Sequence, residues 1–342
     1  MLNEYLLFLA KTATVLVAVI VLLAALARQR QGSGGSDPGR LQARGLNERY
    51  RQRAQTLDRA GGHRSWRARW REALVPGRLT SRAASLPERR IYLLDFEGDL
   101  RARAVEALRE EVSAVIAAAR AGQDEVVLRL ESPGGAVPAY GLAASQLARL
   151  REAEIPLTVC VDRVAASGGY LMAAVGDRIL AAPFALVGSI GVVGSLPNFH
   201  RWLRNRDIDF EEHTAGPDKR SLTLFGENTE RDRERFREDL EHIHEQFKGF
   251  LRRYRPQLDV EAVATGEFWL AERALAAGLI DSLQTSDDYL MAQREQARLI
   301  EVRYHRREGM AKRLGAVTER LLGRRFGGML RLLADPERSS RA

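Results

Sequence analysis

A single serine stands in a run of small residues, Val-Ala-Ala-Ser-Gly-Gly-Tyr at 164–170. An apolar, strand-like run at 155–161 precedes Ser167, and helix-compatible residues begin at Gly168. A serine between a strand and a helix can expose its hydroxyl, and the first N–H groups of the helix have no acceptor within it. The serine hydroxyl could therefore attack a carbonyl carbon, and the free N–H groups could stabilise the oxyanion that forms. Taken alone, the run equally suits a helix N-cap beside two turn glycines.

Two further glycine-rich elements accompany this serine. Glu-Ser-Pro-Gly-Gly at 131–135 directly follows a predicted strand, and Gly-Ser-Ile-Gly-Val-Val-Gly at 188–194 is the other element. Paired glycines after a strand allow close approach of the backbone to a ligand and expose consecutive N–H groups. Neither element continues as Gly-Lys-Ser/Thr, and the chain has no G-x-G-x-x-G, so a phosphate loop is not indicated.

A hydrolytic serine needs a base, and the sequence leaves two kinds open. Of the six histidines, His200 and His213 are possible bases, whereas His242 and His244 lie two apart on a predicted helix and do not share a face. The other choice is a lysine, as in Ser-Lys hydrolases. Lys219 lies in a polar segment between structured elements of a chain that otherwise strongly prefers arginine. It fits equally well as a surface residue.

Taken together, these motifs resemble the signal peptide peptidase family of serine peptidases. The resemblance rests on the motifs at 131–135, 164–170 and 188–192, followed by His-Thr-Ala-Gly-Pro-Asp-Lys-Arg-Ser at 213–221. It is strong over about 90–300. It implies a ClpP/crotonase-like α/β fold, no metal or organic cofactor, and assembly into rings in which neighbouring protomers complete each other's sites.

The resemblance also implies the roles of individual residues. Ser167 matches the nucleophile, Lys219 the general base, and Ser189 the serine that orients this lysine. Gly168 and one of Gly134 and Gly135 match the N–H donors of the oxyanion hole. One departure from the family is Pro217-Asp218 before the lysine, where a bulkier residue is common, and we expect Asp218 to face solvent.

The N-terminus carries a candidate membrane anchor. Residues 6–27 are apolar apart from Lys11, which is long enough to span a bilayer. A cleaved signal peptide is the alternative, although the basic start is missing. Arginines that follow the span place the C-terminal part in the cytoplasm by the positive-inside rule, whereas the family's catalytic domains typically face the periplasm, so the side stays open.

The charge is uneven along the 342 residues, whose formal net charge is +8. Residues 28–90 hold 16 Arg against 5 acids, and residues 301–342 hold 11 Lys or Arg against 5 acids, which leaves the middle acidic. Basic flanks suit anionic lipid headgroups. Few aromatic residues and no recognised nucleic-acid motif lie there, so a nucleic-acid partner is not indicated. The single cysteine, Cys160, excludes an internal disulfide.

We expect four segments: a transmembrane anchor over 1–30, a basic juxtamembrane linker over 31–89, the peptidase domain over 90–300 and a basic amphipathic tail over 301–342. Strands are predicted at 91–96, 125–130, 157–161, 178–181 and 187–193, and helices at 102–121, 140–151, from 168 and at 229–254. Their alternation indicates an α/β architecture with mostly parallel strands. Within the juxtamembrane linker, 41–71 is expected to include a solvated basic helix.

The leading interpretation is an inner-membrane serine endopeptidase that cleaves signal-peptide remnants or membrane and misfolded proteins through an acyl-enzyme. Its expected partners are peptide or protein substrates, the bilayer and further copies of itself. A catalytically silent, membrane-bound peptide-binding scaffold is the alternative. Acyl-CoA chemistry, which the crotonase-like fold also supports, is a third option, but no acidic pair is placed for it.

Overall fold

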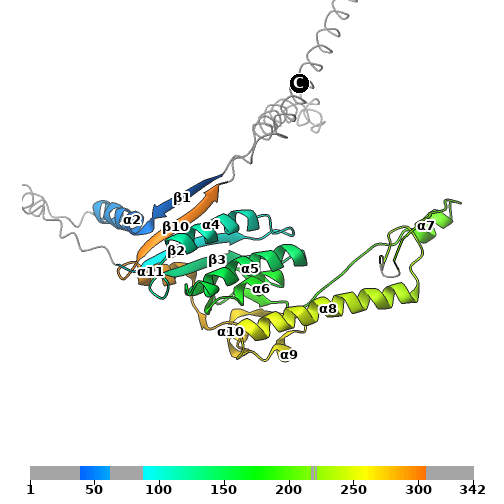
Figure 1. The fold of residues 1–342 in the computed structure, drawn as a ribbon. Coiled ribbons are helices and arrows are strands. Elements are labelled where there is room, and N and C mark those ends of the chain that lie inside the picture. The colour runs from blue at the N-terminus through cyan, green and yellow to red at the C-terminus, as the bar shows by residue number, and fades with distance from the viewer. Residues whose placement is uncertain (1–38, 62–87, 217–218, 220–221, 306–342) are drawn as a thin grey trace, which may run out of the picture. The chain divides into compact units, whose positions relative to one another are not determined.

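The computed structural model describes residues 39–61, 88–216, 219 and 222–305, and the compact unit runs from Leu41 to Tyr304. Figure 1 shows a sheet with helices on both faces. The elements in chain order are β1 (Arg40–Gly45), α2 (Leu46–Ala60), β2 (Arg90–Glu97), α4 (Val105–Ala118), β3 (Glu125–Glu131), α5 (Val137–Glu152), β4 (Leu157–Val161), β5 (Val164–Ala166), α6 (Gly168–Ala173), β6 (Arg178–Ala181), β7 (Leu186–Gly188), α7 (His200–Arg204), α8 (Glu230–Tyr254), α9 (Val260–Val263), β8 (Phe268–Leu270), α10 (Ala271–Ala276), β9 (Ser282–Leu283), α11 (Ser286–Gln293) and β10 (Arg298–His305).

Within the described residues the strands form two sheets. The larger has the order β1-β10-β2-β3-β4-β6-β9, and every neighbouring pair from β10 to β9 is parallel. The smaller has the order β5-β7-β8, with β5 and β7 parallel and β8 antiparallel to β7. The prediction of an α/β fold with mostly parallel strands is therefore confirmed.

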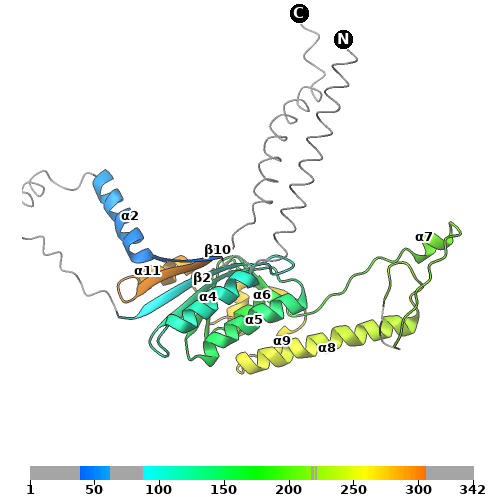
Figure 2. The ribbon, with the colours of Figure 1, turned by 45° about the horizontal axis from the view of Figure 1, so that its top comes forward.

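The two faces of the larger sheet bury different cores, because alternate side chains of a strand point to opposite faces. Tyr92, Leu94 and Phe96 of β2 belong to the main cluster, which α4, α5, α6 and α8 cover. Ile91 and Leu93 belong to a second cluster on the other face, under α2 and α11. Figure 2 shows α4 and α5 on one side of the sheet and α2 and α11 on the other.

Residues before Arg90 take part in this unit. β1 lies beside β10 at the edge of the larger sheet, and Leu46 of α2 is 5% exposed within the second cluster. Asn47 binds the chain near β10, since its side chain donates to Ala297 O at 2.9 Å and accepts from Leu299 N at 2.8 Å. The rest of α2 is largely exposed, which confirms the predicted solvated basic helix for this part of the expected linker.

Helix α8 matches the predicted helix and begins as its sequence dictates. Thr229 is the N-cap: its hydroxyl accepts from Asp232 N at 3.2 Å, while the Asp232 carboxylate accepts from Thr229 N at 2.8 Å. This capping box satisfies two N–H groups of the helix start. At the other end Leu251 is fully buried in the main cluster, so the C-terminal half of α8 is fixed to the body.

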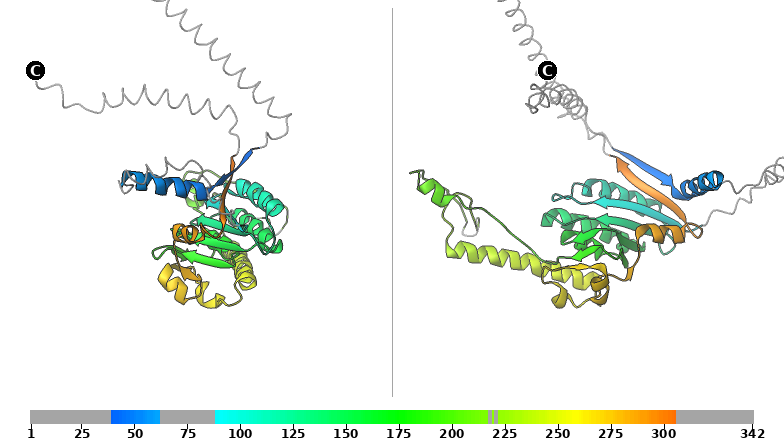
Figure 3. Two further views of the ribbon diagram at one scale, coloured as in Figure 1. Left: turned by 90° about the vertical axis from the view of Figure 1, so that its left-hand side faces the viewer. Right: turned by 180° about the vertical axis from the view of Figure 1, so that it is seen from behind.

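The first half of α8 and the described residues between 191 and 229, which are 191–216, 219 and 222–229, form an arm that extends from the body. Figure 1 and the right panel of Figure 3 place α7 at the end of the arm, far from the larger sheet. Two segments of the arm are joined where Phe199 N donates to Leu224 O at 2.7 Å. Large apolar side chains of the arm stay exposed: Leu196, Phe199, Trp202, Ile208, Phe210, Leu224 and Phe225.

No helix in the described ranges is sufficiently long and apolar to cross a bilayer. The expected anchor over 6–27 and the amphipathic tail from Arg306 both lie outside the described residues.

Candidate active site

Ser167 lies on a strained turn between β5 and α6. Its backbone has φ 50° and ψ −119°, a region that L-residues other than glycine rarely adopt. Two backbone hydrogen bonds hold the turn: Ser167 N donates to Gly188 O at 2.7 Å, and Ser167 O accepts from Leu171 N at 2.9 Å. The strand before the serine is thus β5 of the smaller sheet, a short strand that the sequence analysis did not predict, rather than the apolar strand β4.

Three parallel strand ends meet at this turn. β3 reaches β5 through a bridge between Ser132 and Ala165, and β5 pairs with β7 in the register Ala166 to Gly188. Ser167 and Ser189 are therefore the next residues of two paired strands, and Ser189 also has φ 50°. Its N–H donates to Glu267 O at 2.7 Å. The three motifs found in the sequence thus gather at one edge, as the carboxyl ends of parallel strands do.

The two glycines after β3 have different environments. Gly134, at φ +88°, donates its N–H to Ser132 Oγ at 3.1 Å, so that donor is already used. Gly135 lines the same pocket as Ser167 and Gly168, and among the described residues no backbone acceptor is found for its N–H. Gly168 is the first residue of α6, so its N–H has no acceptor within the helix.

Tyr140 stabilises this arrangement through the hydrogen bonds of its hydroxyl, and the sequence analysis did not predict it as a site residue. Its hydroxyl donates to Asp99 O at 2.9 Å and accepts from Ser132 Oγ at 2.6 Å. Burial raises the pKa of Tyr140, which keeps the hydroxyl protonated as a donor. The ring leaves no room for a side chain at Gly168, where a Cβ would lie 2.5 Å from Tyr140 Cγ.

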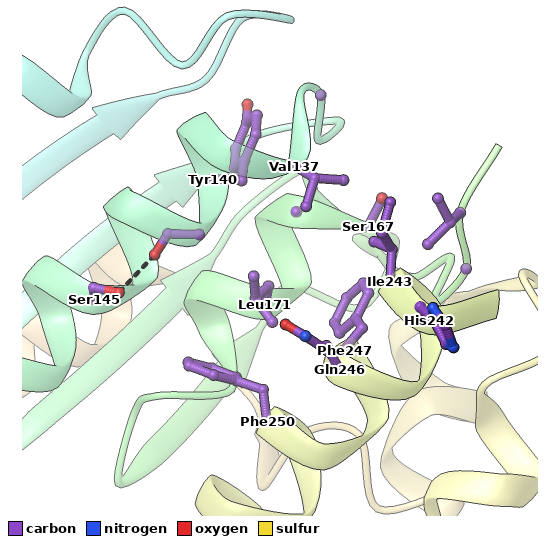
Figure 4. A pocket seen from close by; sticks show the side chains of 15 residues that line it. Val137, Tyr140, Ser145, Ser167, Leu171, His242, Ile243, Gln246, Phe247 and Phe250 are labelled. Atoms are coloured by element: carbon purple, nitrogen blue, oxygen red, sulfur yellow. Dashed lines mark hydrogen bonds between the residues drawn. The ribbon is translucent and has the colours of Figure 1, made fainter. Parts of the chain in front are cut away.

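A cavity of about 380 Å³ opens beside Ser167, between α5, α6 and α8. Figure 4 shows Leu171, Phe247 and Phe250 lining it below Ser167. Polar side chains also contribute to its lining. The complete lining consists of Gly135, Val137, Tyr140, Gly141, Ser145, Ser167, Gly168, Leu171, Gly191, Val192, His242, Ile243, Gln246, Phe247 and Phe250.

Of the residues considered as the general base, neither Lys219 nor the two candidate histidines line the pocket of Ser167. Lys219 is exposed, belongs to the connection between α7 and α8 in the arm, and does not line the pocket of Ser167. Neither His200 nor exposed His213, whose Nε2 lies 3.7 Å from Glu211, lines it. His242 does line it, although its spacing from His244 had set it aside. Asp218 lies outside the described residues.

In the ranges that the structure describes, no group of three or more His, Cys, Asp or Glu side chains is arranged to hold a metal ion. Cys160 is buried in β4, and burial raises its pKa to about 12, so its thiol stays protonated.

Comparison with known proteins agrees with this geometry. Residues 1–147 match the N-terminal region of peptidase family S49, and residues 149–300 match peptidase family S49. A protein named "Probable protease SohB" from Buchnera aphidicola is 50% identical over 229 residues, which cover 67% of this chain and 68% of that protein. This chain belongs to peptidase family S49.

Two further relatives are also named as proteases. A "Probable protease SohB" from Haemophilus influenzae is 48% identical over 229 residues, or 67% of this chain and 65% of that protein. A "Protease 4" from Salmonella typhi is 30% identical over 176 residues, or 51% of this chain and 28% of that protein. The match to this chain thus spans just under two thirds of the Haemophilus relative.

Proposed function

We propose that this member of family S49 is a membrane-anchored serine endopeptidase with a Ser-Lys dyad. The observation that carries the proposal is the position of Ser167, on a strained turn with the N–H groups of Gly135 and Gly168 beside it and an apolar pocket below. Substrates would be signal-peptide remnants or membrane and misfolded proteins. The relatives named as proteases support the same class of activity.

The chemistry follows from the groups at the turn. Ser167 Oγ attacks the scissile carbonyl carbon, the carbonyl π electrons move to oxygen, and the N–H groups of Gly135 and Gly168 stabilise that oxyanion. Gly135 is favoured over Gly134 because the Gly134 N–H already donates to Ser132 Oγ. Neutral Lys219 takes the serine proton and passes it to the leaving amine, and water then hydrolyses the acyl-enzyme. Ser189 orients the lysine; it follows Gly188 directly, as Ser167 follows Ala166, the register partner of Gly188.

Lys219 would act on the Ser167 of a neighbouring copy. It is exposed on the arm, and it does not line the pocket of its own chain. The arm also leaves aromatic side chains such as Phe199, Trp202 and Phe225 exposed, as an assembly surface would.

The apolar stretch over 6–27 would anchor the protein in the inner membrane, and the basic residues after it would contact the lipid headgroups.

Labelling with a fluorophosphonate probe tests the proposal in the detergent-solubilised chain. We expect covalent modification of Ser167, cleavage of casein, and loss of both in Ser167→Ala. Ser113, whose hydroxyl is exposed and donates to Arg109 O, provides the matched control, Ser113→Ala, which should retain both. A folded protein assembled in lipid that is neither labelled nor able to cleave would favour the silent peptide-binding scaffold.

A further inference from the structure

Four glycines line the pocket beside Ser167; the fold itself requires two of them and leaves little room for a side chain at a third. A Cβ at Gly168 would overlap the ring of Tyr140, and one at Gly135 would overlap the backbone of Leu100. A Cβ at Gly191 would lie 3.2 Å from Gly266 Cα, which is tighter than an ordinary contact. Gly135 and Gly168 thus exclude a side chain for reasons internal to the protein, and Gly191 is crowded for a reason of the same kind.

Gly141 is different. It lies within α5, which spans Val137–Glu152, and a Cβ built there meets no heavy atom within 4 Å. Its φ is not positive, so the backbone does not demand glycine. Glycine inside a helix is less favourable than alanine, and neither packing nor conformation compensates for it at this position. What the missing side chain leaves is open space in the pocket.

Apolar side chains form most of the walls around that space. Ser145, whose Oγ donates to Gly141 O at 2.8 Å, and His242 and Gln246 of α8 add polar groups to the lining. Leu171 follows Ser167 by one helical turn, and Phe247 and Phe250 face it from α8 (Figure 4). A group that enters between these side chains from Ser167 passes the bare backbone at Gly141. The apolar walls select an apolar group, and the absence of a side chain at Gly141 determines how large that group can be.

We propose that Gly141 is a specificity-determining position: it keeps the pocket deep enough for a large apolar substrate side chain, such as that of Leu or Phe, beside the bond that Ser167 attacks. This inference rests on the proposed function, since it takes the bound peptide to be a substrate that Ser167 cleaves. A leucine at position 141 would fill the pocket from the side of α5 and leave room only for a small side chain such as that of Ala.

Binding to catalytically inert protein tests the inference without any need for cleavage. The probes are two dansylated peptides that differ only in one residue, Phe or Ala, and the measurement is fluorescence anisotropy with full-length Ser167→Ala. We expect tighter binding of the Phe peptide. Adding Gly141→Leu should weaken the affinity for the Phe peptide by at least about tenfold and change the affinity for the Ala peptide by less than about threefold.

Gly249 provides the matched control. It is an exposed glycine inside α8 that also has no heavy atom within 4 Å of a built Cβ, but it does not line the pocket. Gly249→Leu in the Ser167→Ala background should leave both affinities unchanged. The Gly141→Ala variant should have a melting temperature no lower than that of the parent protein. Its affinity for the Phe peptide should fall by an intermediate amount, which separates an effect of pocket volume from misfolding.

The cleavage arm uses the same peptides with Ser167 intact, and Gly141→Leu should reverse the preference from Phe to Ala. Equal effects of Gly141→Leu on both peptides, or failure of Ser167→Ala to prefer the Phe peptide, would overturn the assignment of Gly141. If the binding preference reverses but the wild-type chain cleaves neither peptide, the proposed function fails and Gly141 stands as a determinant of binding.

Discussion

Adding one methyl group at Gly168 should damage the candidate oxyanion hole more than it damages the fold. The Cβ of Gly168→Ala would lie 2.5 Å from Tyr140 Cγ, whereas ordinary contact begins at 3.4 Å, so the groups must separate by about 0.9 Å. Tyr140 cannot move freely, because its hydroxyl is bound to both Ser132 and Asp99. The turn that carries Ser167 and the Gly168 N–H must therefore shift.

The magnitude follows from that displacement. A shift of about 1 Å in a catalytic group can cost about 10²-fold, and removal of one oxyanion donor costs about 10²–10³-fold in kcat. We therefore expect kcat to fall by at least about 100-fold with little change in KM, because the oxyanion exists only after attack. Overpacking of this buried site should lower the free energy of unfolding by about 1–3 kcal/mol.

Steady-state cleavage of one peptide by the assembled chain, together with urea unfolding, measures both effects. Gly249→Ala is the control, since the same methyl group there meets no neighbour and should leave kcat unchanged. A Gly168→Ala protein that is folded and keeps kcat within threefold of wild type would refute the position assigned to the oxyanion.

Three further outcomes are expected. Burial raises the pKa of Glu111 from its usual 4.5 to about 7, so the folded chain holds a proton that the unfolded chain releases. The free energy of unfolding should then fall as the pH rises from 4.5 to 7, by up to about 3 kcal/mol. Urea unfolding should show no such fall for Glu111→Gln, whereas Glu110→Gln, at an exposed position, should show the same fall as the wild type. Tyr140→Phe loses the hydrogen bonds of the hydroxyl to Ser132 and Asp99 and should lower kcat by about tenfold in peptide cleavage, whereas an unchanged kcat would show that the hydroxyl does not support the site. Cys160 should not react with a thiol reagent until the chain unfolds, and rapid modification of the native protein would contradict its burial.

The larger sheet was predictable because its strands carry their own signal. The apolar runs of β2, β3 and β4 are buried on both faces, and a strand of that kind reads as a continuous hydrophobic stretch. β5 has only three residues, Val164–Ala166, and its hydrogen-bonding partner β7 lies about twenty residues further along the chain. β1 is largely exposed and polar. Neither strand has a local pattern, since each depends on pairing with a distant segment.

The candidate site divides in the same way. Ser167 and its neighbouring glycines were identifiable because glycine-rich runs directly after strands allow the backbone to approach a ligand closely and expose its N–H groups. The apolar wall from α8 was not, since Phe247 and Phe250 look like ordinary members of an amphipathic stripe. His242 was set aside because it shares no face with His244, yet a single helix position is enough to reach a pocket. Tyr140 gave no signal beyond a buried aromatic residue.

Mixing two inactive variants tests the central claim most directly. Ser167→Ala keeps Lys219 and Lys219→Ala keeps Ser167, so neither homo-oligomer should cleave casein. In rings of randomly mixed subunits, about a quarter of the sites would join an intact Ser167 to an intact Lys219 of the neighbour, and about a quarter of the wild-type rate should return. Co-purification through two different tags verifies that mixed rings have formed. Verified mixed rings that remain inactive, or a Lys219→Ala protein that cleaves at nearly the wild-type rate, would contradict the account, and in the second case His242 becomes the base to test.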